Sequence, residues 1–450
     1  MASASVATQG AAVPVPRGIL GRDVPVYQPA VGEVEGRDVL SLQNPTGALV
    51  LRDAVALALM QSPTLGGFAW ETRALEARIL QAGRPPNPAV SALLEDIGAS
   101  QAGSSLEQFV HPQATIELSQ LIELGGKRAA RRQLATANRD LAAWDYETAR
   151  IDVLTEVTRA FTDVLVAQDT VALTQETTRL VEEVRQSVGA RVQAGVVSPI
   201  EETRATVAMV NVRVEAARAR RTLDASRTRL ALLWGSPSPA FTTVTGDLKP
   251  EPVPLPSMAD LMTRIEQNPE LARWTVELSQ RGAALAVERS KRAPDVSVAA
   301  GYRRFTDIDS NAFLVGATIV LPFFDRNKGG VEEARSRLAR AHEEQRAARA
   351  RVAAFLADDY ATLASARDEV TALRTEVIPG AQQTFDAVSE GYRLGKFGYL
   401  EVLDAQRTLI NARNQYLRAL SDYRNAVTAV ERLIGAPLTA GTTPAQAAKE

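Results

Sequence analysis

The chain has 450 residues, of which 45% are apolar and 23% charged, and its formal net charge is −2. This length and apolar content are sufficient for a large core, and the near-neutral charge lacks the basic footprint of a nucleic-acid-binding protein. The absence of cysteine excludes disulfides and thiolate sites, and only two histidines occur, so we expect no metal site, no cofactor and no enzymatic activity.

The first predicted helix covers about 51–83 and ends before Pro85 and Pro86, because proline breaks the helical hydrogen-bond ladder. A β-hairpin is predicted next, over about 88–121. Ile116 and Leu118 alternate there with polar residues, a period of two that is typical of strands. The alternation is less regular in the first strand of this pair.

A very long helix is predicted over 127–193, where no proline occurs and the first glycine is Gly189. Its apolar residues step by three and four. At about 1.5 Å per residue, roughly 65 residues span about 100 Å, which is longer than an ordinary globular domain needs. A turn at Gly195 and a shorter helix over about 198–234 follow. Sustained 3-4 spacing predicts coiled-coil-like packing of these rods.

The second half of the chain repeats this order after a Pro-rich linker at 241–256. The predicted elements are a helix, a hairpin, a long helix interrupted at Pro379-Gly380, and a return helix after Gly395. Their ranges are about 257–291, 294–322, 331–390 and 398–434. In the hairpin, alternation is clear at Val296, Val298, Ala300 and Tyr302. Residues 439–450 are expected to form a disordered tail.

An internal repeat connects the two halves at a spacing of about 200 residues. Gly195, Ile200, Glu201 and Ala205 match Gly395, Leu400, Glu401 and Ala405. Such ordered matches predict two structural repeats, 48–240 and 257–438. The fold class is therefore mainly α with a small β part.

Four strands of about ten residues each are long enough to cross a membrane at a tilt. They cannot close a barrel, for which about eight strands are the practical minimum, and an open edge is not tolerated in lipid. The strands must then join those of other copies, and three copies would give twelve strands and a wall of twelve helical rods. Aromatic residues at strand ends fit a membrane-interface girdle, namely Tyr302, Phe305, Phe323 and Phe324. A soluble hairpin packed on helices is the alternative.

Three sequence strings carry a resemblance to a known family: Gln81–Pro88, Leu118–Arg128, and Tyr392–Gly395 followed by Tyr399–Gln406. With this order of elements, residues 48–438 resemble the TolC-family outer-membrane factors, the exit ducts of tripartite efflux pumps. The second string is most similar to the heavy-metal branch of CzcC-like and CusC-like subunits.

The resemblance implies a homotrimer in the outer membrane that extends into the periplasm. A transmembrane β-barrel of twelve strands would be continuous with a periplasmic α-barrel of twelve helices. The implied partners are a periplasmic adaptor, an inner-membrane RND transporter and outer-membrane lipid. Heavy-metal cations are the expected cargo. Residues 1–47 would form an extended periplasmic strap. The alternatives are a channel for drug efflux or type I secretion, and a soluble coiled-coil scaffold.

The resemblance also implies a periplasmic gate. Glu401 and Asp404 fall at the acidic-ring positions of the family, Tyr392 at its bonding tyrosine, and Glu201 keeps an acid in the first half. Phe397 stands where some members carry a basic gate residue. An alternative is that the acids only complement a helix N-terminus. The two helical turns are the expected adaptor contacts, through Gly195, Val196, Leu394, Gly395 and Lys396.

Overall fold

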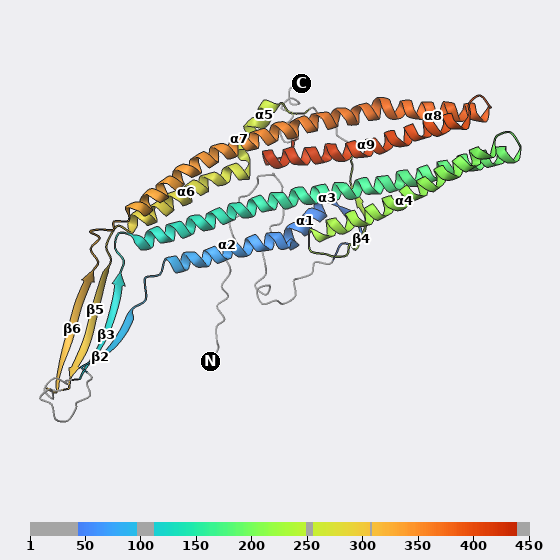
Figure 1. Ribbon diagram of the computed structural model, residues 1–450. Helices are drawn as coiled ribbons and strands as arrows, with labels where there is room; N and C mark the ends of the chain where they lie inside the picture. The colour runs from blue at the N-terminus through green and yellow to red at the C-terminus, as the bar shows by residue number, and fades with distance from the viewer. Residues whose placement is uncertain (1–43, 97–111, 249–254, 307, 439–450) are drawn as a thin grey trace, which may run out of the picture. The chain divides into compact units, whose positions relative to one another are not determined.

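The computed structural model describes residues 44–96, 112–248, 255–306 and 308–438. Most of these residues are helical, and two small sheets complete the fold (Figure 1). The prediction of a mainly α protein with a small β part is confirmed. Almost all of the predicted strap, 1–47, and the predicted tail, 439–450, lie outside the described residues. Chain contacts divide the described residues into two compact units, the first comprising those within 44–70, 144–272 and 348–438 and the second those within 71–143 and 273–347.

The second unit contains a four-stranded antiparallel sheet in the order β2-β3-β5-β6. Its strands are β2 (Ala89–Glu95), β3 (Gln113–Ile122), β5 (Val296–Phe305) and β6 (Ser310–Ile319). The central pairing joins strands from the two halves of the chain, with Ile122 opposite Val296 and Gln113 opposite Phe305. The two edges of the sheet are β2 and β6, each paired on one side only among the described residues.

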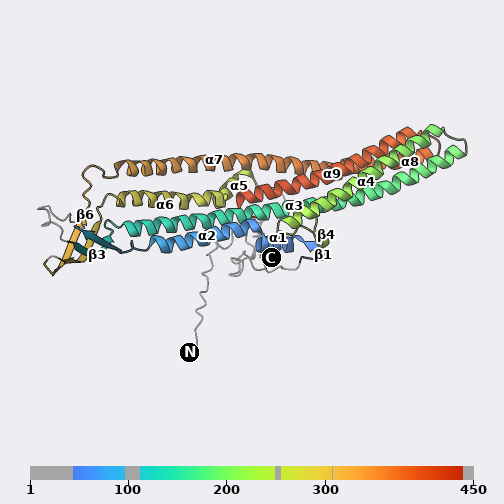
Figure 2. The same ribbon diagram turned by 60° about the horizontal axis from the view of Figure 1, so that its bottom comes forward.

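Helices leave this sheet from one end, as Figure 1 and Figure 2 both show. They are parts of α2 (Pro63–Ala82), α3 (Lys127–Gln193), α6 (Pro269–Ser290) and α7 (Lys328–Ala372). The connection from β3 to α3 is fixed to the start of β5. Asp295 there accepts a hydrogen bond from Leu124 N at 3.2 Å and forms an ion pair with Lys127 at 2.7 Å.

The first unit is built from helices and a two-stranded parallel sheet. Its elements are α1 (Leu51–Gln61), α4 (Pro199–Leu232), α5 (Met258–Arg264), α8 (Ile378–Arg393), α9 (Tyr399–Ile434), a 3₁₀ turn (Ile265–Gln267), a π-turn (Leu373–Val377) and the strands β1 (Gly47–Val50) and β4 (Phe241–Thr245), with the remaining parts of α2, α3, α6 and α7. A core cluster includes the fully buried Phe241, which lies against Trp234 with ring centres 6.2 Å apart.

The first helix of each repeat is broken where a single helix was expected. α1 ends at Gln61 and α2 begins at Pro63, and in the second half the break falls at Asn268–Pro269. A residue before proline is driven out of the helical region by the proline ring, and Ser62 and Asn268 are indeed extended. The Asn268 side chain then caps α6 by accepting from Glu270 N at 2.7 Å.

The stretch 241–256, interpreted from sequence as a linker, contains strand β4. It pairs in parallel with β1, with Val244 opposite Leu49. Its residues Phe-Thr-Thr-Val-Thr place apolar side chains three positions apart and so lack the period of two that marks a strand. Their partner strand lies almost 200 residues earlier in the chain, so no local signal could reveal the pairing.

Candidate functional site

The two turns between long and short helices have the same backbone geometry. Gly195 and Gly395 both adopt positive φ, at +69° and +75°. Val196 N donates to Arg191 O at 2.9 Å, and Lys396 N donates to Gly391 O at 2.8 Å. This is the hydrogen bond of a Schellman helix end, in which glycine is favoured because it lacks a Cβ. Four of the five expected adaptor-contact residues are therefore equivalent in pairs, Gly195 with Gly395 and Val196 with Lys396.

The side chains at these turns are open to contact. Val196 and Leu394 are each 62% exposed, and Lys396 is also exposed. Apolar side chains at such exposure are available for a partner surface.

Behind the turns, α3, α8 and α9 pack around two tyrosines, Tyr392 and Tyr399. Both are buried, and their ring centres are 6.1 Å apart. The guanidinium of Arg191, at the end of α3, lies over the Tyr392 ring with 4.3 Å between its central carbon and the ring centre. The cluster also includes Val188 and Ala205, so it joins the α3–α4 hairpin to the α8–α9 hairpin.

The structure brings two of the expected gate residues together, Glu201 and Tyr392. The Tyr392 hydroxyl and Glu201 Oε2 are buried atoms, and neither has a hydrogen bond of normal geometry within the described chain. Burial raises the pKa of the Tyr392 hydroxyl, the Arg191 charge lowers it, and the Glu201 carboxylate raises it. Glu201 is thus an electrostatic neighbour of Tyr392.

The other two expected gate acids, Glu401 and Asp404, lie elsewhere on this unit. Both are exposed on α9, three residues apart and so on one side of the helix. Glu401 lies in the first turn of α9, and a Cβ placed on Gly398 would meet its Oε2 at 2.9 Å. The carboxylate therefore folds back toward the helix N-terminus, a favourable position for a negative charge.

A close contact that sequence reasoning missed is that of Gly391 with Phe397. A Cβ on Gly391 would lie 2.2 Å from the Phe397 ring. The ring can occupy this place only because Gly391 has no side chain. Arg191 was also missed. An aromatic residue just beyond a glycine could have suggested the first contact, whereas nothing local pairs Arg191 with a tyrosine 201 residues away.

The four-stranded sheet has one strongly apolar face. Residues directly opposite each other in antiparallel strands point to the same side. By that rule this face carries the apolar residues Val90, Ala92, Leu94, Ile116, Leu118, Val298, Ala300, Tyr302, Phe313, Val315 and Ile319, with Gln120, Arg304 and Asn311 as polar members. Among the described residues this face is uncovered, since Phe313 is 86% and Val315 85% exposed.

The opposite face is mostly polar or small, with Ser91, Glu95, Gln113, Thr115, Glu117, Ser119, Arg303 and Gly316 among its residues. Arg303 Nε donates to Thr115 Oγ1 at 2.9 Å, and its guanidinium lies 3.3 Å from Glu95 Oε2. The two faces thus differ as the lipid and water sides of a membrane sheet would.

The expected aromatic girdle residues divide between these locations. Tyr302 lies on the apolar face, edge-on to Phe313 at 5.9 Å, and its hydroxyl donates to Asn311 Oδ1 at 2.6 Å. Phe323 and Phe324 follow β6 and are strongly exposed. Phe305 falls on the polar face, because it is an odd number of residues from Tyr302 along β5.

The described part of the chain lacks two features, a helix that could span a membrane and a group of side chains that could hold a metal ion. No helix there is long and apolar enough to cross a membrane. Within the same residues, no group of three or more His, Asp or Glu side chains is arranged to hold a metal ion.

The exposed apolar face of the sheet and the long paired helices are features of a membrane channel subunit. The chain belongs to the outer membrane efflux protein family, whose model matches residues 54–236 and 263–436. It is 36% identical to the cobalt-zinc-cadmium resistance protein CzcC of Cupriavidus metallidurans, over 87% of this chain and 91% of that protein.

Solved structures agree on the fold. A membrane protein from Pseudomonas aeruginosa has a TM-score of 0.73 at 20% identity, covering 92% of this chain and 97% of its own. CusC has a TM-score of 0.71 at 18% identity, covering 92% and 99%. These two structures show the shared fold, and membership of the outer membrane efflux protein family excludes the scaffold alternative.

Proposed function

We propose that the chain is one third of a trimeric exit duct whose barrel has twelve strands. The supporting observation is the uncovered apolar face of a sheet with two free edges, β2 and β6. In lipid, backbone N–H and C=O groups at an edge must find partners. Four strands are too few to close on themselves, and three symmetry-related sheets supply twelve.

The long helices would form the periplasmic wall of the same duct, as twelve rods from three chains. The two-repeat plan gains support from the family model, which matches the chain in two consecutive segments. Each repeat supplies one long helical run, α3 or α7 through α8, and three shorter helices, α1, α2 and α4 or α5, α6 and α9, which stacked end to end approach the length of the long run.

The periplasmic end of the duct would be gated at the helical turns. In this proposal, Tyr392 and Glu201 hold the two hairpins of one chain together. Glu401 and Asp404 remain exposed and would contribute to a threefold acidic ring that favours cations. Gly195, Val196, Leu394, Gly395 and Lys396 would contact the periplasmic adaptor.

The cargo we propose is a heavy-metal cation, conducted passively while an inner-membrane RND transporter supplies the energy. The similarity to a cobalt-zinc-cadmium resistance protein supports this class of cargo. A drug-efflux or type I secretion channel would share the fold and differ in partner and cargo.

Cross-linking tests the barrel, because the chain has no cysteine of its own. We expect Val90→Cys combined with Val315→Cys, one on each edge strand, to give a covalent trimer with a bis-maleimide in native membranes. Each single variant is the control and cannot form a closed ring of three. Monomers alone from the double variant would contradict the trimeric barrel.

Metal susceptibility tests the cargo. A strain that lacks this chain should become sensitive to cobalt, zinc or cadmium salts, and the wild-type chain should restore growth. Sensitivity to drugs with unchanged metal tolerance would instead favour the drug-efflux alternative.

A further inference from the structure

Exposed basic side chains gather where the four-stranded sheet meets its helices. They are Arg84, Arg128, Arg132, Arg289, Arg292 and Lys328, called here the basic collar. We propose that the collar binds the phosphate groups of anionic phospholipids, with Arg128 and Arg132 at the centre of one headgroup site. The proposal rests on the proposed function only in that the sheet lies in a membrane.

The strand pairing places the collar at a single end of the sheet. Ala89 at the start of β2 lies opposite Ser119, Ile122 opposite Val296, and Val296 opposite Ile319. All four connections between strands and helices therefore leave from this end. Collar residues that are far apart in sequence belong to these connections or to the helical turns next to them.

Three acidic side chains near these connections are engaged by other basic residues, whereas Asp325, in the β6–α7 connection, accepts a hydrogen bond from Asn327 N at 2.8 Å and has no ion-pair partner among the described residues. Asp295 pairs with Lys127 at 2.7 Å, Glu288 with Lys291 at 2.5 Å, and Glu123 accepts from Arg131 Nη2 at 2.8 Å. No collar residue has an ion-pair partner among the residues that the structure describes. The six positive charges of the collar consequently outnumber the unpaired carboxylate of Asp325, and the excess positive charge attracts anions.

The far end of the sheet is different. Arg303 pairs there with Glu95 at 3.3 Å, and Arg304 with Asp309 at 2.7 Å. Among the described residues, the basic side chains of the collar, at the helix end of the sheet, are unpaired. At the other end of the sheet, both Arg303 and Arg304 have an acidic partner.

The apolar face leads directly to the collar. After β6, Val320 is 75% exposed and Phe323 69%, and Phe324 is fully exposed. Lys328 follows four residues later. Aromatic rings next to long basic side chains are the arrangement found at the boundary between lipid tails and headgroups. A lipid has both the tail for the apolar face and the phosphate for the collar, whereas a free phosphate ion has only the second.

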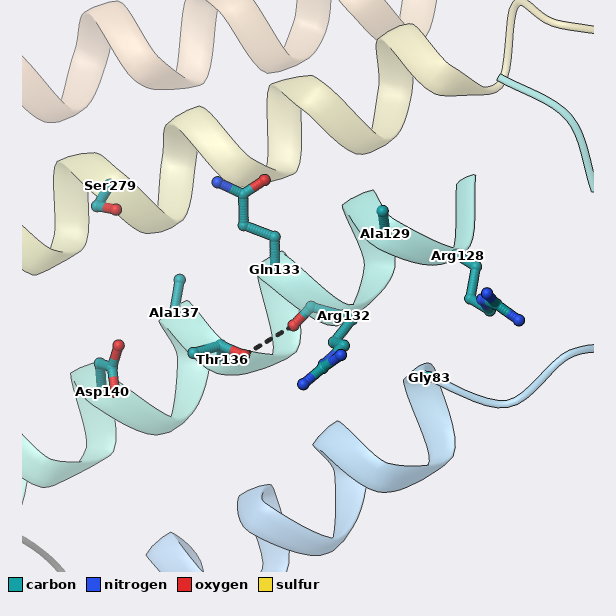
Figure 3. Close-up of a pocket in the computed structure, with 9 residues that line it drawn as sticks. All are labelled: Gly83, Arg128, Ala129, Arg132, Gln133, Thr136, Ala137, Asp140 and Ser279. Atoms are coloured by element: carbon teal, nitrogen blue, oxygen red, sulfur yellow. Dashed lines mark hydrogen bonds between the residues drawn. The ribbon is translucent and has the colours of Figure 1, made fainter. Parts of the chain in front are cut away.

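A hollow of about 710 Å³ lies at Arg128 and Arg132 (Figure 3). The two arginines are four residues apart and so adjacent on α3. The Arg132 stem passes the end of α2, where a Cβ on Gly83 would lie 3.8 Å from its Cδ. Arginine offers a planar fork of donors that fits phosphate oxygens. Gln133 also lines the hollow, and its amide can donate to a glycerol headgroup. The Thr136 hydroxyl donates to Arg132 O at 3.0 Å and can accept from the headgroup, and Asp140 in the same lining pairs with Arg139 at 3.2 Å.

The test measures headgroup preference directly. The detergent-purified full chain is titrated with dioctanoyl phosphatidylglycerol or dioctanoyl phosphatidylcholine, and bound lipid is counted by native mass spectrometry. We expect phosphatidylglycerol to bind more tightly than phosphatidylcholine. Arg128→Gln with Arg132→Gln should lower the affinity for phosphatidylglycerol about 25-fold, at roughly fivefold per basic side chain. Millimolar inorganic phosphate should not displace the lipid.

Arg220→Gln with Arg221→Gln is the matched control, since both arginines are exposed on α4 and lie outside the collar. This control variant should keep the preference for phosphatidylglycerol over phosphatidylcholine. Arg128→Lys with Arg132→Lys should keep most of that preference. Equal affinity for both lipids, an unaffected Gln variant, or displacement by inorganic phosphate would overturn the proposal. Channel activity of the wild type in planar bilayers separates the failure of the two proposals. If the wild type conducts ions but shows no headgroup preference, only the lipid site at the collar is refuted. If the wild type does not conduct ions, the exit-duct proposal is refuted.

Discussion

Arg191 and Tyr392 are 201 residues apart in sequence and joined twice in the structure. The guanidinium lies 4.3 Å from the centre of the tyrosine ring, and Arg191 Nη1 donates to the Tyr392 carbonyl at 2.6 Å. The first contact is a cation–π interaction and the second a charge-assisted hydrogen bond. Together they tie the end of α3 to the end of α8, so that the two helical hairpins are held at their turns.

Replacing this arginine should loosen the turns. Arg191→Met keeps an apolar stem over the Tyr392 ring and removes both the charge and the donor. A loss of about 1–3 kcal/mol shifts a two-state equilibrium roughly 5- to 150-fold. We therefore expect larger or longer openings in planar-bilayer recordings. Arg179→Met, at an exposed position earlier on α3, is the control, and identical currents from both variants would refute the role given to Arg191.

Tyr399 should be the last tyrosine of this cluster to ionise. Burial, followed by the Tyr392 hydroxyl and the Glu201 carboxylate, raises its pKa from 10.0 to about 12. A raised pKa favours the protonated, folded form. Tyr399 therefore stabilises the fold fully below pH 10 and loses this contribution as the pH rises through about 12.

Tyrosinate absorbance measures this directly. Tyr399→Phe should remove a step near pH 12 from the titration of the folded protein, and its stability should fall less between pH 10 and 12. A step of unchanged size in the variant would show that another tyrosine accounts for it.

The exposed acids of α9 provide a test of the proposed ring. Glu401→Gln with Asp404→Asn removes two negative charges per chain without shortening the side chains. We expect the preference for cations, read from reversal potentials in a salt gradient, to decrease. Glu376→Gln with Asp386→Asn removes the same charge from exposed positions before α9. If both pairs shift the reversal potential equally, the ring assignment fails.

Gly391 and Gly380 form a matched pair on α8. A Cβ on Gly391 would lie 2.2 Å from the Phe397 ring, whereas a Cβ on Gly380 meets nothing within 4 Å. Gly391→Ala should displace Phe397 and cost about 1–3 kcal/mol, the usual range for overpacking. Gly380→Ala should be neutral or slightly stabilising. Thermal unfolding of both variants checks the difference, and equal melting temperatures would contradict the close approach.

Neighbouring residues of β6 test the lipid face of the sheet. Val315 lies on the apolar face and Leu314 on the other. An arginine on the lipid side near mid-membrane costs about 2–4 kcal/mol. Val315→Arg should therefore reduce the folded fraction in lipid vesicles, measured by urea titration. Leu314→Arg should be tolerated, and the reverse order would exclude the proposed orientation of the sheet.

The repeating elements could be predicted because their patterns are local. Ile116 and Leu118 face one side of a strand whatever surrounds them, and the 3-4 spacing of α3 marks its packing stripe. Pro63 shows the limit. Proline is permitted at the start of a helix as well as after its end, so the predicted helix 51–83 was extended through a break that the structure places at Ser62.

The grouping of the four candidate gate residues depends still more on tertiary structure. The family resemblance implied one candidate site for Glu201, Tyr392, Glu401 and Asp404, whereas the structure associates Tyr392 with Glu201 and leaves the other two acids exposed. Helical spacing indicates which residues share a side of one helix. It does not indicate which side of another helix they meet.

The amino-acid sequence by itself determined the alternation of the strands, the extent of the long helix 127–193 and the twofold recurrence of the elements along the chain. The first two follow from residues within a few positions of one another, and the third follows from matching strings about 200 residues apart. Only the tertiary structure decided that Arg191 meets Tyr392, that Phe397 fills the space over Gly391, and that six basic residues from separate connections share one end of a sheet. These contacts depend on how distant segments pack, and packing is set by the simultaneous fit of many side chains.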